Sequence, residues 1–306
     1  MKKLTFIVIS FVLLLSYTNS LSGICIRKEL LYTKYTLADQ YQAGKDMRSF
    51  QWNKIDSMLT LLDSFQHRHL LMATIRNYKN SYGNVPLIEP HIQGKYNNLT
   101  DTFGVERYQS IPLYSTDSVP RLIRYGRDGA LGAVIGDSVD YYKMTFAFIS
   151  GEWFVPKKYV YIIGPVFFRK SIFVDRTNQN IATLEQRDTC WYVHSMNPAT
   201  TGLNNPPYQK PTPKGIFVIQ EQKSRMIFYK DGTDIEGGFA PYASRFCCGG
   251  YIHGVPVNYP ATSLIEYSPT LGTNPRSHMC VRNATSHALF IYNWVGRYDT
   301  LVFVFD

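Results

Sequence analysis

Beyond residue 20, the 306-residue sequence has no apolar stretch long enough to cross a membrane. Charged residues make up only 18% of the chain, and the net charge of +9 includes no run of five or more basic residues. Such dispersed charge offers no continuous patch for phosphate contacts, so we do not expect nucleic-acid binding. The positive excess suits an anionic partner instead, such as a bacterial wall or a phospholipid headgroup layer.

Cysteine is scarce, and the five are Cys25, Cys190, Cys247, Cys248 and Cys280. An odd number in an exported chain leaves at least one thiol unpaired, which makes that thiol a candidate for chemistry. We expect the adjacent Cys247 and Cys248 to be two small buried residues, with a vicinal disulfide as the alternative. Cys25 follows Ile24, where lipid attachment requires a small residue, so lipidation is not expected.

The N-terminus is typical of an export signal. Lys2 and Lys3 precede an apolar run from Leu4 to Leu15, and small or polar residues follow it. This run is too short to span the hydrocarbon layer as a helix, which favours a cleaved signal over an uncut membrane anchor. We therefore predict a signal peptide over residues 1–20. The mature chain is expected in the periplasm or cell envelope, with no stable membrane span.

Three further regions are expected after the signal. Residues 21–100 are predicted to be mostly helical, because apolar residues in 52–75 recur at steps of three and four. Residues 101–165 contain short strands and turns, and the segment 151–160 (GEWFVPKKYV) resembles the closing strand and turn of a bacterial SH3-like β-barrel.

The last region, residues 166–306, is predicted to be mainly β. A hairpin is expected from 171–175 and 181–184, and further strands at 215–219 and 225–229. Residues 301–305 are expected to form a terminal strand buried on both faces.

One pair of segments in this region can carry chemistry. A strand-like segment ends in His253-Gly254, and a loop contains Ser277-His278-Met279-Cys280-Val281-Arg282. Only the thiolate of a cysteine attacks well, and a neighbouring imidazole can take the thiol proton or, as imidazolium, lower the thiol pKa. Arg282 could stabilise the thiolate or bind a substrate carboxylate. From the residues alone, a buried thiol beside a structural histidine is an equally open interpretation.

The same residues resemble the catalytic domain of the L,D-transpeptidases, the YkuD family. The family signature is His-Gly followed later by Ser/Thr-His-Gly-Cys, a hydrophobic residue and Arg or Asn. This chain has both parts in order, but Met279 stands where the family usually has Gly. Two upstream segments also fit: 170–184 resembles the family's opening hairpin, and 212–217 resembles its Thr-Pro-x-Gly-x-Phe segment.

The resemblance implies a fold and a set of roles. It implies a YkuD-type β-sandwich preceded by the barrel and the helical region. Cys280 is implied as the nucleophile and His253 as its base, oriented by the Gly254 carbonyl, with His278 supporting the thiolate. Amides around Met279 and Cys280 are implied to form the oxyanion hole. The expected substrate-binding residues are Ser277, Met279, Arg282 and, on a lid hinged at Gly237-Gly238, Tyr242.

The implied reaction is acyl transfer on stem tetrapeptides of peptidoglycan. Release of D-alanine through a Cys280 acyl-enzyme would give 3-3 cross-links, or a tripeptide if water is the acceptor, as in an L,D-carboxypeptidase. Carbapenems are expected to acylate the same cysteine. No metal or other cofactor is expected. An inactive wall-binding protein with a degenerate catalytic fold is the alternative from another class.

Overall fold

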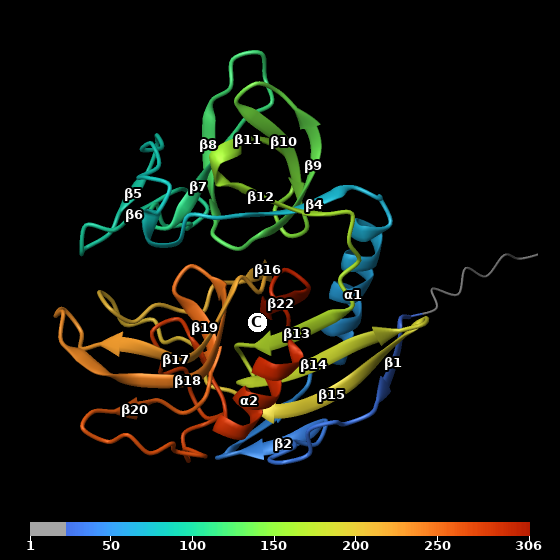
Figure 1. Cartoon of the computed structure of the whole chain (residues 1–306), viewed down its shortest axis with the longest axis vertical. Helices are drawn as coiled ribbons and strands as arrows, with labels where there is room; N and C mark the ends of the chain where they lie inside the picture. Colours follow the sequence, from blue (N-terminus) through green and yellow to red (C-terminus); the bar gives the residue numbers. More distant parts are fainter. Residues whose placement is uncertain (1–22) are drawn as a thin grey trace, which may run out of the picture.

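The computed structural model describes residues 23–306, which form mainly β-strands as predicted. The predicted signal peptide lies outside the described residues. Among the residues described, no helix combines the length and apolar character needed to span a membrane. Figure 1 shows a seven-stranded sheet at the top and a larger body below it, built on two further sheets.

A six-stranded sheet forms one layer of the body. In spatial order its strands are β1 (Cys25–Lys28), β15 (Cys190–Pro198), β14 (Asn180–Arg187), β13 (Lys170–Asp175), β22 (Thr300–Phe305) and β16 (Gly215–Val218). Strands β13 and β14 form the predicted hairpin. All of β22 is buried, which confirms the predicted terminal strand. A disulfide joins Cys25 to Cys190 at paired positions of β1 and β15, so the Cys25 sulfur is already bonded.

The second sheet of the body carries the residues of chemical interest. Its strands are β17 (Glu221–Tyr229), β18 (Glu236–Cys247), β19 (Gly250–His253) and β21 (Val281–Arg282), with β20 (Val257–Asn258) also paired to β18. Helix α2 (Thr285–Trp294) packs against β18 and β19. Strands β17 and β18 form a long hairpin that extends to the left in Figure 1.

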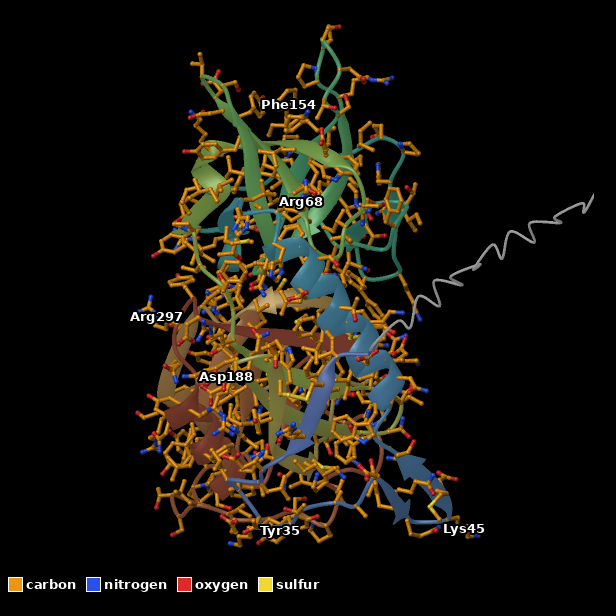
Figure 2. All side chains as sticks on the ribbon, turned by 90° about the vertical axis from the view of Figure 1, so that its right-hand side faces the viewer. Tyr35, Lys45, Arg68, Phe154, Asp188 and Arg297 are labelled. Carbon is orange, nitrogen blue, oxygen red and sulfur yellow. A yellow bond between two sulfur atoms is a disulfide. The ribbon has the colours of Figure 1, made fainter. Side chains whose placement is uncertain are left out.

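The prediction of a mostly helical region over 21–100 is wrong. Only α1 (Trp52–Gln66) is an α-helix there, and its buried residues at three- and four-residue spacing pack into the core beside the six-stranded sheet. The helix ends at Gln66, and His69, three residues further on, adopts a φ of 51° that no helix can continue through. Figure 2 shows α1 in front, with Arg68 near its upper end.

The rest of that region consists of short strands, a 3₁₀ turn (Tyr78–Asn80), turns and loops. It contains β1, the hairpin of β2 (Gln40–Ala43) and β3 (Asp46–Ser49), and β4 (Leu71–Ile75). The β2–β3 hairpin projects from the base of the molecule, where Figure 2 labels Lys45 at its tip. Strand β4 continues the apolar pattern of the helix, but its backbone pairs with β9 and β12, and these sheet contacts override the helical spacing.

The seven-stranded sheet begins before the predicted boundary at residue 101. In spatial order its strands are β12 (Val160–Gly164), β4, β9 (Leu131–Asp137), β10 (Tyr141–Phe146), β11 (Glu152–Pro156), β7 (Ser110–Tyr114) and β8 (Leu122–Arg127). The predicted strand and turn at 151–160 is present as β11, a 3₁₀ turn (Lys157–Tyr159) and β12. A small arm carries β5 (Ile92–Gln93) and β6 (Leu99–Thr100). The likeness of the whole unit to an SH3-like barrel stays a prediction.

The turn between β8 and β9 joins this sheet to the body. Gly129 adopts a φ of 86°, and a Cβ atom there would lie 2.0 Å from the carbonyl oxygen of Phe246. Only glycine permits this approach of two backbones. Beside it, the buried Asp128 accepts hydrogen bonds from Asn77, Gln220, Arg245 and Cys248. One apolar core continues across the junction, so the two units are packed together.

Candidate active site

The register of two parallel strands brings the predicted nucleophile and base to one face. Strand β19 pairs with β21 so that Ile252 lies opposite Val281 and His253 opposite Arg282. Side chains alternate between the faces of a sheet, and Cys280 immediately precedes β21. Cys280, Arg282 and His253 therefore point to the same side. All three line one cavity of about 770 Å³.

The imidazole of His253 is held by the backbone carbonyl predicted to orient it. Its Nδ1 lies 2.6 Å from the Gly254 oxygen, so we assign the Nδ1–H tautomer, and Nε2 remains as the nitrogen that can accept a proton. A larger side chain at Gly254 would force Thr285 and Pro241 to move, because a Cβ atom would lie 2.8 Å from Thr285 Oγ1 and 2.9 Å from Pro241 Cγ. Burial lowers the pKa of His253 to about 4, although the hydrogen bond to the Gly254 carbonyl acts to raise it.

The thiol of Cys280 is also buried, and its side chain packs with Ala243 and Tyr251. Burial raises its pKa, while a backbone hydrogen bond from Tyr251 and the charge of Arg282 act in the opposite direction. The thiol donates to the Gly249 oxygen at 3.6 Å. A thiolate–imidazolium pair is therefore not the resting state. Burial disfavours both charges, so the pair rests as a neutral thiol and a neutral imidazole.

The loop before the thiol has an unusual backbone. Met279 adopts a φ of 89°, a region that favours glycine, in agreement with the glycine expected there. The Ser277 hydroxyl donates to the Cys280 carbonyl, and the Thr212 hydroxyl donates to the Met279 carbonyl at 2.8 Å. Within residues 23–306 the amides of Met279 and Cys280 donate to no backbone or side-chain acceptor. These two amides can bind a developing oxyanion.

Arg282 is a largely buried cation in the same cavity. It forms no ion pair with any described carboxylate, and its Nε has no hydrogen-bond partner within the described chain. Burial lowers the pKa of its guanidinium. An unpaired buried cation gains free energy from an anion, so this side chain is suited to binding a substrate carboxylate.

His278 lies at the edge of the cavity and is exposed. Its Nε2 is 3.0 Å from the Asp231 carboxylate, at the tip of the β17–β18 hairpin. The hairpin residues Phe228 and Tyr229 line the cavity as well. Neither Asp231 nor this cover by the hairpin was predicted from the sequence, although Asp231-Gly232 is typical of a turn between two strands.

The predicted role of Tyr242 as a lid residue is wrong. Its ring packs against Tyr292 of α2, with centroids 6.0 Å apart, and it does not line the thiol cavity. Tyr242 has a φ of 54° and falls where the pairing of β17 and β18 is interrupted. This local break could not be anticipated from the neighbouring glycines.

The remaining cysteines and histidines have structural surroundings. Cys247 and Cys248 are buried, unbonded thiols with sulfur atoms 3.6 Å apart, as expected. His287 is fully buried and contacts Asn283 and Ser195. Among residues 23–306, no group of three or more His, Cys, Asp or Glu side chains is arranged to hold a metal ion.

Residues 169–304 match the YkuD family, the L,D-transpeptidase catalytic domain. This YkuD match includes five strands of the six-stranded sheet, all except β1. It also includes the whole sheet that carries Cys280 and His253. It does not include the seven-stranded sheet or α1. No curated protein matches the chain.

Solved structures show partial similarity. A fused Zn-dependent amidase/peptidase/peptidoglycan-binding domain-containing protein from Clostridium acetobutylicum has 16% identity and a TM-score of 0.32, over 45% of this chain and 52% of that one. An L,D-transpeptidase from Mycobacterium smegmatis has 16% identity and a TM-score of 0.36, over 51% and 73%. L,D-transpeptidase 3 from Mycobacterium tuberculosis, in complex with a faropenem-derived adduct, has 18% identity and a TM-score of 0.36, over 57% of this chain and 79% of that one. The chain spans about half the length of the first of these, 52%. TM-scores of this size do not establish a common overall fold.

Proposed function

We propose that this chain is an exported cysteine acyltransferase of the L,D-transpeptidase type, acting on peptidoglycan stem tetrapeptides in the periplasm or cell envelope. The observation that carries the proposal is the shared cavity of Cys280, His253 and the unpaired Arg282. The YkuD match over 169–304 supports it. The apolar N-terminus supports export.

The first half-reaction forms a thioester. Cys280 Sγ attacks the carbonyl carbon before the terminal D-alanine, and the thiol proton passes to His253 Nε2. The carbonyl oxygen becomes an oxyanion that the Met279 and Cys280 amides bind. The C–N bond then breaks, and the imidazolium returns its proton to the departing D-alanine amine. Because the resting pair is neutral, negative charge arises on sulfur only as the attack proceeds.

The second half-reaction depends on the acceptor. An amine of another stem attacks the thioester, His253 takes the amine proton, and the thiol is restored as a 3-3 cross-link forms. Water as acceptor would release a tripeptide instead, as in an L,D-carboxypeptidase. The cavity has room for a peptide donor, and the Arg282 guanidinium fits a carboxylate of that donor.

Incubation of purified protein with tetrapeptide muropeptides, followed by mass spectrometry, tests the proposal. We expect cross-linked dimer with loss of D-alanine, and a fall of at least about 10³-fold in the Cys280→Ala variant. Tripeptide without dimer would select the carboxypeptidase alternative. No product from folded wild-type protein would favour the inactive wall-binding alternative and contradict the proposal.

Two further measurements use the same site. A carbapenem should add its mass to the wild-type chain but not to Cys280→Ala, because the thiol is the group that its ring carbonyl acylates.

The Arg282→Gln variant should lower kcat/KM by about tenfold or more through loss of a charge-assisted bond to the substrate carboxylate. The exposed Arg276 lies on the same loop outside the cavity, so Arg276→Gln is the matched control.

A further inference from the structure

A second and larger cavity lies between the seven-stranded sheet and the body. Its volume is about 1160 Å³. The arm residues 94–108 and the side chains of Arg124, Arg127 and Phe148 line one side, and residues 204–217 line the other. We call it the interdomain cleft. Figure 1 shows the β5–β6 arm on the left, the side toward which the β17–β18 hairpin also extends.

The interdomain cleft leads toward the candidate nucleophile. Met279, directly before Cys280, lines it. A small cavity of about 190 Å³ shares Arg127, Lys210 and Met279 with the cleft and shares His278 with the thiol cavity. The 277–280 loop thus has the thiol cavity on one side and the cleft on the other. An acyltransferase must admit a second substrate to its thioester, and the cleft offers a separate approach.

Positive charge dominates the interdomain cleft. Six basic side chains line it, against a single acidic one, Glu106. Glu106 is paired with Lys210, and Asp306 is shared by the basic residues Arg176 and Lys214. The remaining basic residues Lys95, Arg124 and Arg127 form no ion pair with any described carboxylate. Arg124 Nε also lacks a hydrogen-bond partner among the described atoms, and burial disfavours its charge. An anionic ligand would satisfy these groups.

Exposed aromatic rings lie among these cations. Tyr96, Phe103, Tyr108 and Phe148 line the cleft, and each is about half exposed, at 46%, 58%, 51% and 54%. The Arg124 guanidinium lies 4.1 Å from the centroid of Phe103. Exposed rings gathered in one concave site mark a binding surface, since their burial by a ligand is favourable. Flat rings pack well against the C–H faces of sugars, and the nearby amides of Asn97, Asn98, Asn204 and Asn205 suit their hydroxyl and acetamido groups.

We propose that the interdomain cleft binds a carboxylate-bearing glycan strand of the wall polymer and so presents a stem of that strand to the acyl-enzyme. Rings would contact the sugars, and Lys95, Arg124 and Arg127 would pair with carboxylates. The proposal rests on the proposed function for the identity of the polymer. Its binding step needs no turnover, which allows the two to be tested separately.

The test measures binding of soluble, uncross-linked glycan strands with tetrapeptide stems to the full-length Cys280→Ala protein, by isothermal titration calorimetry. We expect the strands to bind more tightly than the free tetrapeptide. Added to this background, Lys95→Gln should weaken binding about threefold and Tyr96→Ala about fivefold. Both side chains are exposed at the arm, so neither change threatens folding. Arg121→Gln, at an exposed pair outside the cleft, is the matched control and should change nothing.

Three results would overturn the inference: equal binding of strands and free tetrapeptide, equal binding by the cleft variants and the control, or equal competition by a single-stranded oligonucleotide of matched charge. The last would show that the cleft recognises charge without recognising sugar. If wild-type protein transfers no acyl group but strands bind in this cleft-dependent way, the proposed function fails, and the glycan-binding part of the inference stands without the presentation of a stem to an acyl-enzyme. If acyl transfer occurs but strand binding does not depend on the cleft, the inference fails and the proposed function stands.

Discussion

Met279 combines a bulky side chain with a backbone conformation that favours glycine. Its φ of 89° brings Cβ close to neighbouring backbone atoms, which costs roughly 1–2 kcal/mol for an L-residue. The carbonyl of Met279 is held by Thr212, and its side chain packs on the main apolar core. These contacts stabilise the strained loop. The position therefore keeps the loop geometry expected from the glycine of the family signature.

Comparison of two variants isolates this strain. Met279→Gly and Met279→Ala both remove the packed side chain, but only glycine adopts a φ near 89° without a Cβ contact. We expect Met279→Gly to exceed Met279→Ala in free energy of unfolding by about 1 kcal/mol, measured by urea denaturation. The reverse order would show that the loop relaxes when the methionine is replaced.

Most of the side chains that meet at the thiol cavity could be predicted from the sequence, but their protonation states could not. Cys280, His253, Ser277, His278 and Arg282 were predicted together, and all five line one cavity. Burial depends on contacts that are distant in sequence, so neither the low pKa of His253 nor the raised pKa of Cys280 could be predicted. The contact between Asp231 and His278 could not be predicted either, because Asp231 lies on the β17–β18 hairpin, distant in sequence from the 277–280 loop.

The turn between β8 and β9 links the seven-stranded sheet to strand β18 of the body through the buried carboxylate of Asp128. Asp128 Oδ2 accepts from Arg245 Nη1 at 2.8 Å and from the Cys248 amide at 3.0 Å. Burial opposes the charge of Arg245, but Asp128 acts against this and the pKa of Arg245 is raised. Cys248 immediately precedes Gly249, whose carbonyl accepts from the Cys280 thiol. The turn thus supports the backbone on which the resting nucleophile depends.

Asp128→Asn tests this element. The change keeps the shape but removes the charge, which leaves the buried Arg245 with Glu221, 3.3 Å from its Nε, as its remaining anionic partner among the described residues. We expect the free energy of unfolding to fall by about 3 kcal/mol, measured by urea denaturation. Asp117→Asn, at an exposed pair with Arg121, should change it by less than about 1 kcal/mol. Equal effects of the two variants would mean that Asp128 does not couple the sheet to the body.

Several strands within the body were predictable, whereas the strands among residues 23–100 were not. The β13–β14 hairpin and β22 follow from local patterns of apolar residues and turn formers. Strand β4 follows α1 with the same apolar spacing, and only its partners β9 and β12 make it extended. Pairing with strands far along the chain leaves no pattern in the local sequence. The predicted helix therefore included residues 71–75, which form β4.

Folding places three histidines of the described chain in surroundings that disfavour their charged form. Burial lowers the pKa of His253 to about 4 and of His287 to about 3, and it lowers the pKa of His194 as well. In the unfolded chain each would titrate near pH 6.5. Between these values the unfolded state binds protons that the folded state does not. The contribution to stability is therefore complete above about pH 6.5 and is lost as the pH falls.

The free energy of unfolding should consequently fall by about 2–3 kcal/mol between pH 7 and pH 5.5, from His253 and His287 together. Chemical denaturation at the two pH values measures this difference. His287→Asn removes one of the titrating groups, so the variant should lose about 1 kcal/mol less than the wild type over the same interval, even if it is less stable at pH 7. An undiminished difference in that variant would assign the acid sensitivity to other groups. The Cys280→Ala protein should behave as the wild type, because the thiol stays protonated throughout this range.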